Sequence, residues 1–143
     1  MIDEKVIYIN YLRDNNVKFS KQRETILDAF LAIEKHITVQ ELFDVLKRET
    51  KTIGIATVYR AMKIFCAAGL AQEVDVGDGN KRYEHKFNHA RHDHLICSIC
   101  GKIIEFNDPN LEGIQNKVCK ELGFEPTERK LQIYGICKSC KSV

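Results

Sequence analysis

Apolar positions recur at helical spacing in several segments of the first half of the chain. They predict one helix before Ser20, a second directly after it, a third after Thr38 and a fourth over residues 55–68. Ser20 is a residue type that caps helix N-termini, and Thr38 with Glu41 three positions later has the spacing of a capping box. The N-terminal part of the chain is therefore predicted to be helical.

Beyond Gly69, which is expected to end the last of these helices, the pattern changes to strands. Residues 70–76 and 82–87 are short strand-like segments, and the sequence Gly-Asp-Gly-Asn between them favours a tight hairpin turn. Helices followed by a hairpin are the layout of a winged helix, in which the hairpin is the wing. We therefore predict a winged-helix DNA-binding domain over residues 1–87.

A second and smaller domain is expected over residues 93–143, with residues 88–92 as the hinge. A Cys-x-x-Cys-Gly sequence lies at the tip of its predicted hairpin, and Asp108 followed by Pro109 is a typical helix start. The predicted elements are that hairpin, a helix and a final strand, over residues 94–106, 108–123 and 131–136. The predicted fold class is α+β, with a winged-helix domain followed by a small α/β domain.

Composition narrows the class of protein. The chain has 143 residues, of which 44% are hydrophobic and 29% charged, as in ordinary soluble domains. No apolar run approaches the ~20 residues of a membrane span, and the N-terminal residues lack the layout of an export signal, so we expect a cytoplasmic protein without a membrane partner. The net charge of +2 is too small to indicate nucleic acid by itself. Six cysteines in a reducing compartment favour metal or redox chemistry over disulfides.

Four of the cysteines form two Cys-x-x-Cys pairs, Cys97 with Cys100 and Cys137 with Cys140. Each pair places two sulfur atoms on one side of a tight turn, and two such turns make the four-thiolate cage that Zn²⁺ prefers. Redox dithiols are the alternative. A closed four-coordinate site leaves no open position for a substrate, so the predicted zinc is structural and not catalytic.

Histidines gather just before the first cysteine pair. In an extended chain His92 and His94 share one face, and Glu105 on the partner strand of the hairpin can reach them. Glu84 and His85 lie upstream. Imidazole with carboxylate is a mixed nitrogen and oxygen ligand set, suited to Fe²⁺, Mn²⁺, Zn²⁺ or Co²⁺. The alternative is a solvated linker that happens to be rich in histidine.

The fourth predicted helix has the features of a nucleic-acid contact. Its apolar face includes Val58 and Met62, whereas Thr57, Tyr59 and Arg60 are expected to face outward. An exposed aromatic ring and a guanidinium at the start of such a helix suit bases and phosphates. The alternative is an ordinary solvated helix face.

The order of these motifs resembles the ferric uptake regulator family of bacterial metalloregulators. The resemblance extends from about Val17 to Cys140. It is carried by four segments: Ile55-Ala-Thr-Val-Tyr-Arg60, His92-Asp-His-Leu-Ile-Cys-Ser-Ile-Cys-Gly101, Ile103-Ile-Glu-Phe106 and Ile133-Tyr-Gly-Ile-Cys137. It implies a dimeric repressor, with a tetramer as the alternative, that binds double-stranded DNA at an AT-rich inverted repeat. It also implies that the small α/β domain over residues 93–143 is a dimerisation and metal-binding domain.

The resemblance also implies roles for individual residues. The four cysteines match a structural zinc site. The residues that match a regulatory metal site at the hinge are His36, Glu84, His92, His94 and Glu105. Those that match DNA contacts are Lys18, Arg23, Thr57, Tyr59 and Arg60, with Lys18 at the minor groove and Arg23 on the backbone. Without the resemblance, the isolated His36 would be interpreted as a surface loop histidine. The resemblance implies instead that His36 is the metal ligand supplied by the DNA-binding domain.

This chain departs from the family pattern in two places. The segment between Glu84 and His94 is one residue longer than usual, so that His85 competes with Glu84 as a ligand. Many members also carry a further metal site, whose matching residues here are Arg91, Asp93, Glu112 and Arg129. Arginine does not ligate a metal at physiological pH. We predict that this site holds salt bridges and no metal, although His89 could supply a nitrogen.

Several functions fit these features. The first is a metal-dependent repressor of iron homeostasis with Fe²⁺ as corepressor, for which Mn²⁺, Zn²⁺ or Co²⁺ could substitute in vitro. A peroxide-sensing repressor and a zinc-uptake regulator are alternatives in the same family, and Glu105, where peroxide sensors tend to carry Asp, favours the iron regulator. A metalloenzyme or a metal-storage protein is the alternative from other classes, but we expect no enzyme because no substrate pocket is evident.

Overall fold

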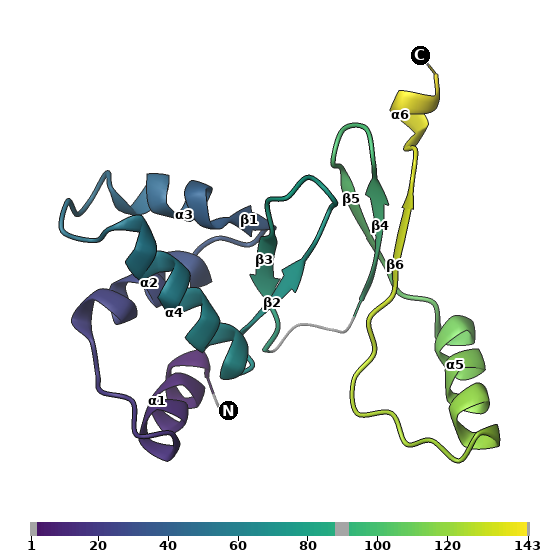
Figure 1. The fold of residues 1–143 in the computed structure, drawn as a ribbon, viewed down its shortest axis with the longest axis horizontal. Helices are drawn as coiled ribbons and strands as arrows, with labels where there is room; N and C mark the ends of the chain where they lie inside the picture. Colours follow the sequence, from purple (N-terminus) through teal and green to yellow (C-terminus); the bar gives the residue numbers. More distant parts are fainter. Residues whose placement is uncertain (1–2, 88–91, 143) are drawn as a thin grey trace. The chain divides into compact units, whose positions relative to one another are not determined.

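The computed structural model describes residues 3–87 and 92–142 of the chain (Figure 1). Two compact units, Met1–His89 and Ala90–Val143, have their own internal contacts and are described separately. The exact limits of the predicted domains and of the hinge over residues 88–92 stay a prediction, because most of that segment lies outside the described residues. None of the helices described here is both long enough and apolar enough to cross a membrane.

The first unit combines four helices with a small sheet, as Figure 1 shows. Its elements are α1 Glu4–Asp14, α2 Lys21–Leu31, β1 Ile37–Thr38, α3 Val39–Leu46, α4 Ile55–Ala67, β2 Ala71–Val74 and β3 Arg82–His85. The sheet is antiparallel with the strand order β1-β3-β2, so that β3 is central. Helices α2, α3 and α4 with the β2–β3 hairpin form the predicted winged helix. The two-residue strand β1 was not predicted, because two residues carry no alternating pattern.

The predicted helix caps are present. The Ser20 side chain accepts a hydrogen bond from the Arg23 amide, and Thr38 with Glu41 forms a complete capping box. Such caps satisfy amide groups that have no partner inside the helix. Strand β2 is shorter than expected because its pairing with β3 ends at Val74, opposite Arg82.

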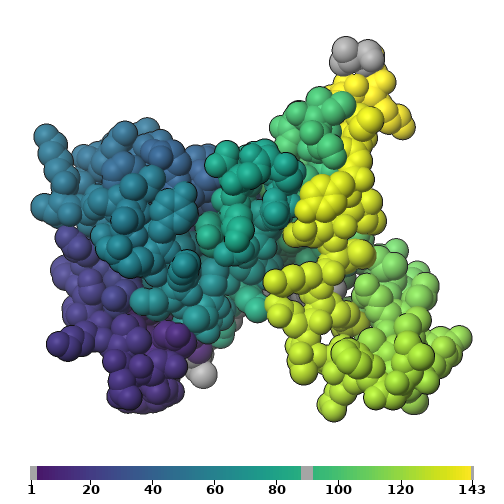
Figure 2. Space-filling view, viewed as in Figure 1, coloured from purple at the N-terminus to yellow at the C-terminus, as the bar shows by residue number. Residues whose placement is uncertain are grey.

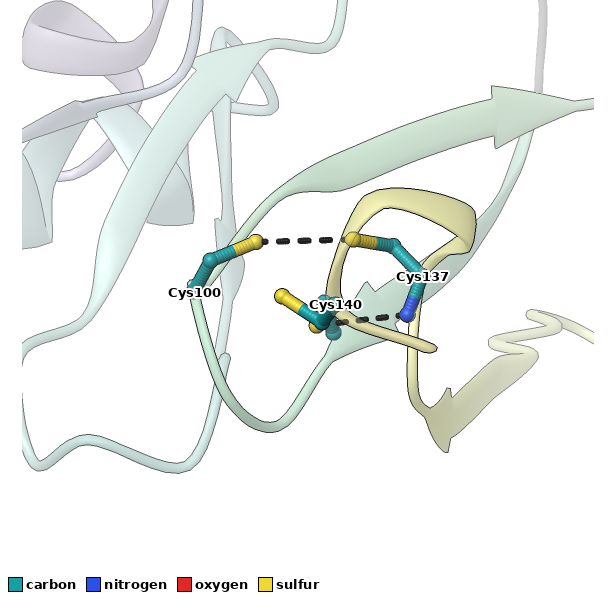
Figure 3. A group of neighbouring side chains, drawn as sticks. Cys100, Cys137 and Cys140 are labelled. Atoms are coloured by element: carbon teal, nitrogen blue, oxygen red, sulfur yellow. Dashed lines mark hydrogen bonds between the residues drawn. The ribbon is translucent and has the colours of Figure 1, made fainter. Parts of the chain in front are cut away.

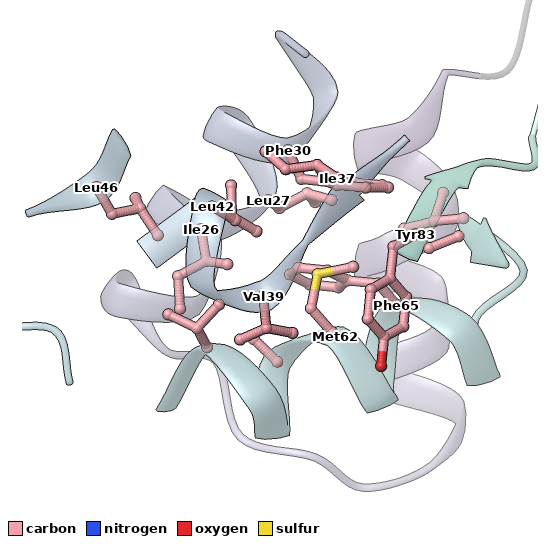
Figure 4. Close-up of a cluster of buried hydrophobic side chains, with 14 of the residues drawn as sticks. Ile26, Leu27, Phe30, Ile37, Val39, Leu42, Leu46, Met62, Phe65 and Tyr83 are labelled. Carbon is pink, nitrogen blue, oxygen red and sulfur yellow. The ribbon is translucent and has the colours of Figure 1, made fainter. Parts of the chain in front are cut away.

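The core of this unit lies where the inner faces of α2, α3 and α4 meet the sheet (Figure 4). Ile26 and Phe30 of α2 and Val58, Met62 and Phe65 of α4 are completely buried. They recur at the helical spacing that the sequence shows. Burial of a large apolar side chain contributes roughly 1.5–3 kcal/mol, so this cluster dominates the stability of the unit.

Tyr8 of α1 carries a buried hydroxyl group that has no hydrogen-bond partner among the described residues. Its ring packs edge-on against Phe65, with 5.8 Å between the ring centroids. A buried polar group without a partner costs about 1–3 kcal/mol of desolvation. We expect Tyr8→Phe to raise the free energy of unfolding by about 1 kcal/mol, measured by urea unfolding. Tyr83→Phe, which loses a hydrogen bond to Glu73, is the control and should not stabilise the protein. A less stable Tyr8→Phe protein would contradict this expectation.

The second unit is a three-stranded sheet with two helices. Its elements are β4 Asp93–Cys97, β5 Ile103–Phe106, α5 Pro109–Glu121, β6 Gln132–Gly135 and α6 Lys138–Lys141. The order is β5-β4-β6, with β5 antiparallel and β6 parallel to β4. The predicted hairpin and final strand are confirmed, as is the Asp108 cap with Pro109 in the first turn. The short helix α6 was not predicted.

Few side chains are buried within this second unit. Ile96 and Cys97 are the buried apolar residues among those described here, and α5 has no buried side chain. Figure 2 shows the green segment of α5 at the surface. The exposed apolar residues of the unit are Ile99, Ile104, Ile114, Val118, Leu122, Phe124, Ile133, Tyr134 and Ile136. An exposed apolar surface of this extent marks an interaction site.

Candidate functional site

The four predicted zinc ligands meet at one end of the second unit (Figure 3). Cys97 ends β4 and Cys100 lies in the turn before β5, while Cys137 and Cys140 lie at the start of α6 and within it. Gly101 closes the first turn with a φ of 76°, a conformation that glycine adopts without strain. The four sulfur atoms all lie within 4.8 Å of one another. The tertiary structure thus joins two pairs that are far apart in sequence.

Backbone amides favour the thiolate form of two of these cysteines. The amides of Cys100 and Cys137 donate hydrogen bonds to the Cys97 sulfur and lower the pKa of that thiol to about 6. The pKa of Cys137 is also lowered, chiefly by the amide of Cys140. The pKa of Cys140 is raised to about 12 because its thiol donates to Cys137. Thiolates are the form that binds a metal.

The spacing of the sulfur atoms fits a tetrahedral zinc site. A tetrahedron with Zn–S bonds of 2.3 Å has edges of about 3.8 Å. The Cys100 and Cys137 sulfur atoms lie 3.7 Å apart. The set of four lies within 4.8 Å, so the cluster is compact enough for four thiolates to surround one Zn²⁺, an arrangement that leaves no position for a substrate.

A polar row crosses the sheet of the first unit. The β1–β3 register pairs Ile37 with Tyr83, and its continuation by one residue places His36 opposite Glu84. The Nε2 atom of His36 lies 2.6 Å from the Oε2 atom of Glu84. The carboxylate of Glu84 is almost completely buried. One imidazole and one carboxylate therefore meet in the winged-helix unit, and both are groups that can ligate a metal.

The same row contains a residue that sequence reasoning missed. Gln72 on β2 is the register partner of Glu84, and its Nε2 atom donates a hydrogen bond to Oε1 of that carboxylate at 2.5 Å. A glutamine in a short strand carries no sequence signal of its own. Only the pairing register, which depends on the length of the wing turn, places it beside Glu84.

His85 faces the other side of the strand from Glu84. Its Nε2 atom lies 2.8 Å from the carbonyl oxygen of Phe30, and its ring packs against the Phe30 ring with 4.8 Å between centroids. Successive residues of a strand point to opposite faces, so Glu84 and His85 cannot both face His36. The geometry favours Glu84 over His85 as the ligand.

The second unit brings His92, His94 and Glu105 together. His94 on β4 is the register partner of Glu105 on β5. The Nε2 atom of His92 lies 3.5 Å from Oε1 of Glu105, and the rings of the two histidines are 4.8 Å apart. Ligands bound to one ion at about 2.1 Å are separated by about 3–3.5 Å, so these three side chains can form half of a metal site.

The predicted salt bridge between Arg129 and Glu112 of α5 is present. Arg129 contacts Oε1 of Glu112 at 2.5 Å and the side-chain oxygen of Asn116 at 2.6 Å. A guanidinium that binds a carboxylate in this way satisfies the negative charge without a metal. Asp93 is buried on β4. Arg91 and His89 lie outside the described residues, and the absence of a metal here stays a prediction.

Two of the expected DNA-contact residues of α4, Tyr59 and Arg60, lie on its outer face, whereas Thr57 is half-buried. Tyr59 is 52% exposed, and Arg60 and Lys63 are also exposed, whereas Val58 and Met62 are buried. The Arg60 guanidinium donates to the Thr57 hydroxyl at 3.3 Å. Gly54 is the N-cap of α4 and supplies no side-chain cap. A helix N-terminus without such a cap can present its first amides to an anion.

Lys18 lies in the segment that leads into α2, and Arg23 lies in the first turn of that helix. Lys18 is exposed, and the Arg23 guanidinium donates to the Lys18 carbonyl oxygen at 3.0 Å. Arg23 thus holds the backbone that carries Lys18. At the wing tip, Arg82 binds both carboxylate oxygens of Asp78, at 2.7 and 2.8 Å, and lowers the pKa of that group.

Comparison with known families identifies the chain. The sequence pattern of the ferric uptake regulator family matches residues 14–134. The chain belongs to this family. The ferric uptake regulation protein of Campylobacter jejuni is 38% identical over 133 residues, which cover 92% of this chain and 84% of that relative. The peroxide-responsive repressor PerR of Staphylococcus saprophyticus is 33% identical, with 93% of this chain and 88% of that relative covered.

A solved structure of the ferric uptake regulator family supports the same conclusion. The Helicobacter pylori ferric uptake regulator, described as having three functional metal-binding sites, matches with a TM-score of 0.83 and 28% sequence identity. The match covers 98% of this chain and 95% of that structure. The predicted fold class, an N-terminal DNA-binding domain followed by a dimerisation domain, is confirmed. The family is one of metal-responsive transcriptional regulators, and its regulators bind DNA and form dimers.

Proposed function

We propose that this protein is a cytoplasmic, metal-dependent transcriptional repressor that uses Fe²⁺ as its corepressor. The observation that carries the proposal is the division of candidate ligands between the two units. His36 and Glu84 meet in the winged-helix unit, whereas His92, His94 and Glu105 meet in the other unit. Each set by itself is an incomplete coordination sphere.

One ion that takes ligands from both sets would couple the two units. The ion binds better to the arrangement in which all five ligands reach it, and therefore shifts the population toward that arrangement. In a dimer, this fixes the distance between two winged helices, which must match successive major grooves. Metal thereby acts as an allosteric effector of DNA binding and not as a catalyst.

Each winged helix would read one half of an AT-rich inverted repeat. The outer face of α4 presents an aromatic ring and a guanidinium, and the exposed Lys18 adds a cation at the start of α2. Arg23, which already donates to the Lys18 carbonyl oxygen, steadies that segment and can contact the DNA backbone with its other N–H groups. These groups fit both base edges and phosphates.

The second unit would form the dimer. Its exposed apolar residues include Leu122 and Phe124, which are 78% and 67% exposed. A unit with so few buried side chains does not form a stable core by itself. A second copy of the chain, placed on this surface, would bury the apolar groups of both copies. A dimer is enough to cover these groups, so the proposal does not require a tetramer.

The choice of Fe²⁺ rests on the named relatives and on Glu105. The first relative is a ferric uptake regulation protein, although a peroxide-responsive repressor is almost as similar. The deciding experiment is an anaerobic DNA-binding titration with Fe²⁺, Mn²⁺ and Zn²⁺, followed by exposure to peroxide. Fe²⁺-dependent binding that survives peroxide supports the proposal. Binding lost through oxidation of a ligand histidine supports the peroxide sensor, and binding that responds to Zn²⁺ alone supports a zinc-uptake regulator.

Tyr59 provides a test of the DNA interface. We expect Tyr59→Ala to weaken operator binding by about 1–3 kcal/mol, because a ring that contacts a base edge would be lost from an exposed face. Metal affinity should not change, since Tyr59 lies on α4 and not in either ligand set. Fluorescence anisotropy with labelled operator, in saturating metal, measures the effect. Unchanged operator affinity would exclude this face of α4 from the interface.

A further inference from the structure

A row of three polar side chains in contact crosses the sheet of the first unit, over the strand order β1-β3-β2. His36 stands at the start of β1, Glu84 on the central strand and Gln72 on β2. One carboxylate oxygen of Glu84 lies 2.6 Å from His36, and the other accepts the Gln72 amide at 2.5 Å. The two oxygens of one carboxylate therefore have different partners on opposite sides.

This division of the two oxygens constrains how Glu84 can bind a cation. A glutamate side chain keeps several rotamers, and its carboxylate rotates easily about the last bond. A hydrogen bond to Oε1 removes that freedom and turns Oε2 toward His36. The amide of glutamine is uncharged, so it orients the carboxylate without competing for the charge of the ion.

We propose that Gln72 is a positioning residue for the metal response. It holds Glu84 so that a single oxygen, Oε2, is presented to the ion beside the imidazole of His36. Groups that hydrogen-bond to a ligand are known to alter metal affinity by about 10–100-fold, because they fix the orientation of the ligand before binding. The inference deepens the proposed function and rests on it, since Glu84 and His36 must be ligands of the regulatory ion.

The test compares three variants of the full-length protein that carries one zinc per chain. Gln72→Met keeps the size of the side chain and removes its amide. Gln40→Met is the matched control, because Gln40 makes the same kind of hydrogen bond to a carboxylate, that of Asp44, at 3.0 Å on the surface of α3. Glu84→Gln removes the ligand itself. Each protein is titrated with Co²⁺, and its visible absorption is recorded.

We expect Gln72→Met to bind Co²⁺ about tenfold more weakly than the unmodified protein, with an altered visible spectrum. The spectrum changes because a carboxylate without its hydrogen bond can bind through both oxygens and raise the coordination number. Gln40→Met should match the unmodified protein in both measurements. A structural role alone would lower the melting temperature and leave the Co²⁺ spectrum as it was.

The outcomes separate this inference from the proposed function. If Glu84→Gln weakens Co²⁺ binding but Gln72→Met leaves affinity and spectrum unchanged, Gln72 has no positioning role and the proposed function stands. Equal losses in Gln72→Met and Gln40→Met would also overturn the inference. If Glu84→Gln binds Co²⁺ like the unmodified protein, Glu84 is not a ligand, and the proposed ligand set is wrong.

Discussion

Replacement of Cys97 by serine is expected to release the structural zinc and to unfold much of the second unit. Cys97 is buried at the end of β4, and its sulfur accepts a hydrogen bond from the Cys137 amide. Ile96 and Cys97 are the buried apolar residues of the part of this unit that the structure describes. A unit with so small a core depends on its metal, and binding of a structural zinc contributes on the order of 10 kcal/mol to folding.

Elemental analysis and thermal melting test this expectation together. Fully loaded protein should contain two ions per chain, one zinc and one regulatory ion, and Cys97→Ser should lose the zinc. Its melting temperature should fall, and the dimer should dissociate in analytical ultracentrifugation. Cys119→Ser is the matched control, because Cys119 lies on α5 of the same unit and outside the four-cysteine cluster. A Cys97→Ser protein with its zinc and a normal melting curve would contradict the assignment.

The same measurement tests whether Arg129 takes the place of a metal. In the structure, the Arg129 guanidinium contacts the side chains of Glu112 and Asn116. A third ion per chain, or a metal bound to Glu112, would overturn that prediction. The relative from Helicobacter pylori, described with three functional sites, is the natural comparison.

Replacement of His36 by alanine is expected to separate metal binding from DNA binding. The variant keeps His92, His94 and Glu105, so it should still bind metal, but more weakly. It loses the imidazole that the winged-helix unit contributes, so the ion no longer favours one arrangement of the two units. Allosteric coupling is worth about 1–3 kcal/mol, or about 5–150-fold in affinity. We expect most of this factor to disappear, while the DNA affinity of the metal-free protein stays unchanged.

Two measurements check the loss of coupling. Operator affinity is measured with and without saturating metal, and metal affinity is measured with and without operator. The factor by which metal raises operator affinity must equal the factor by which operator raises metal affinity. His85→Gln is the control, because His85 contacts the Phe30 carbonyl on the opposite face of β3. We expect His85→Gln to have a lower free energy of unfolding but to keep the coupling between metal binding and DNA binding. If His36→Ala keeps the normal metal-induced gain in DNA affinity, the coupling does not pass through His36.

Local sequence signals were enough for the main architecture. The helix caps at Ser20 and Thr38 and the glycine-rich wing turn act within a few residues, so they are visible in the sequence and present in the structure. The paired spacing of the cysteines is local in the same sense, and each pair lies in one turn. Only β1 and α6 were missed, since elements of two and four residues are too short to show a period.

The details of the candidate metal site depend on pairing between distant strands. The sequence alone favoured Glu84 as the ligand but left His85 as a competitor. The register of β3 placed Glu84 beside His36 and His85 against Phe30. The sequence determined that this is a winged helix and that four cysteines lie in two Cys-x-x-Cys pairs, because local hydrophobic period and residue spacing decide those features. Only the tertiary structure decided which face of the central strand meets His36, and that Gln72 meets Glu84. A shift of one residue in register moves every side chain to the other face, and no local signal carries that information.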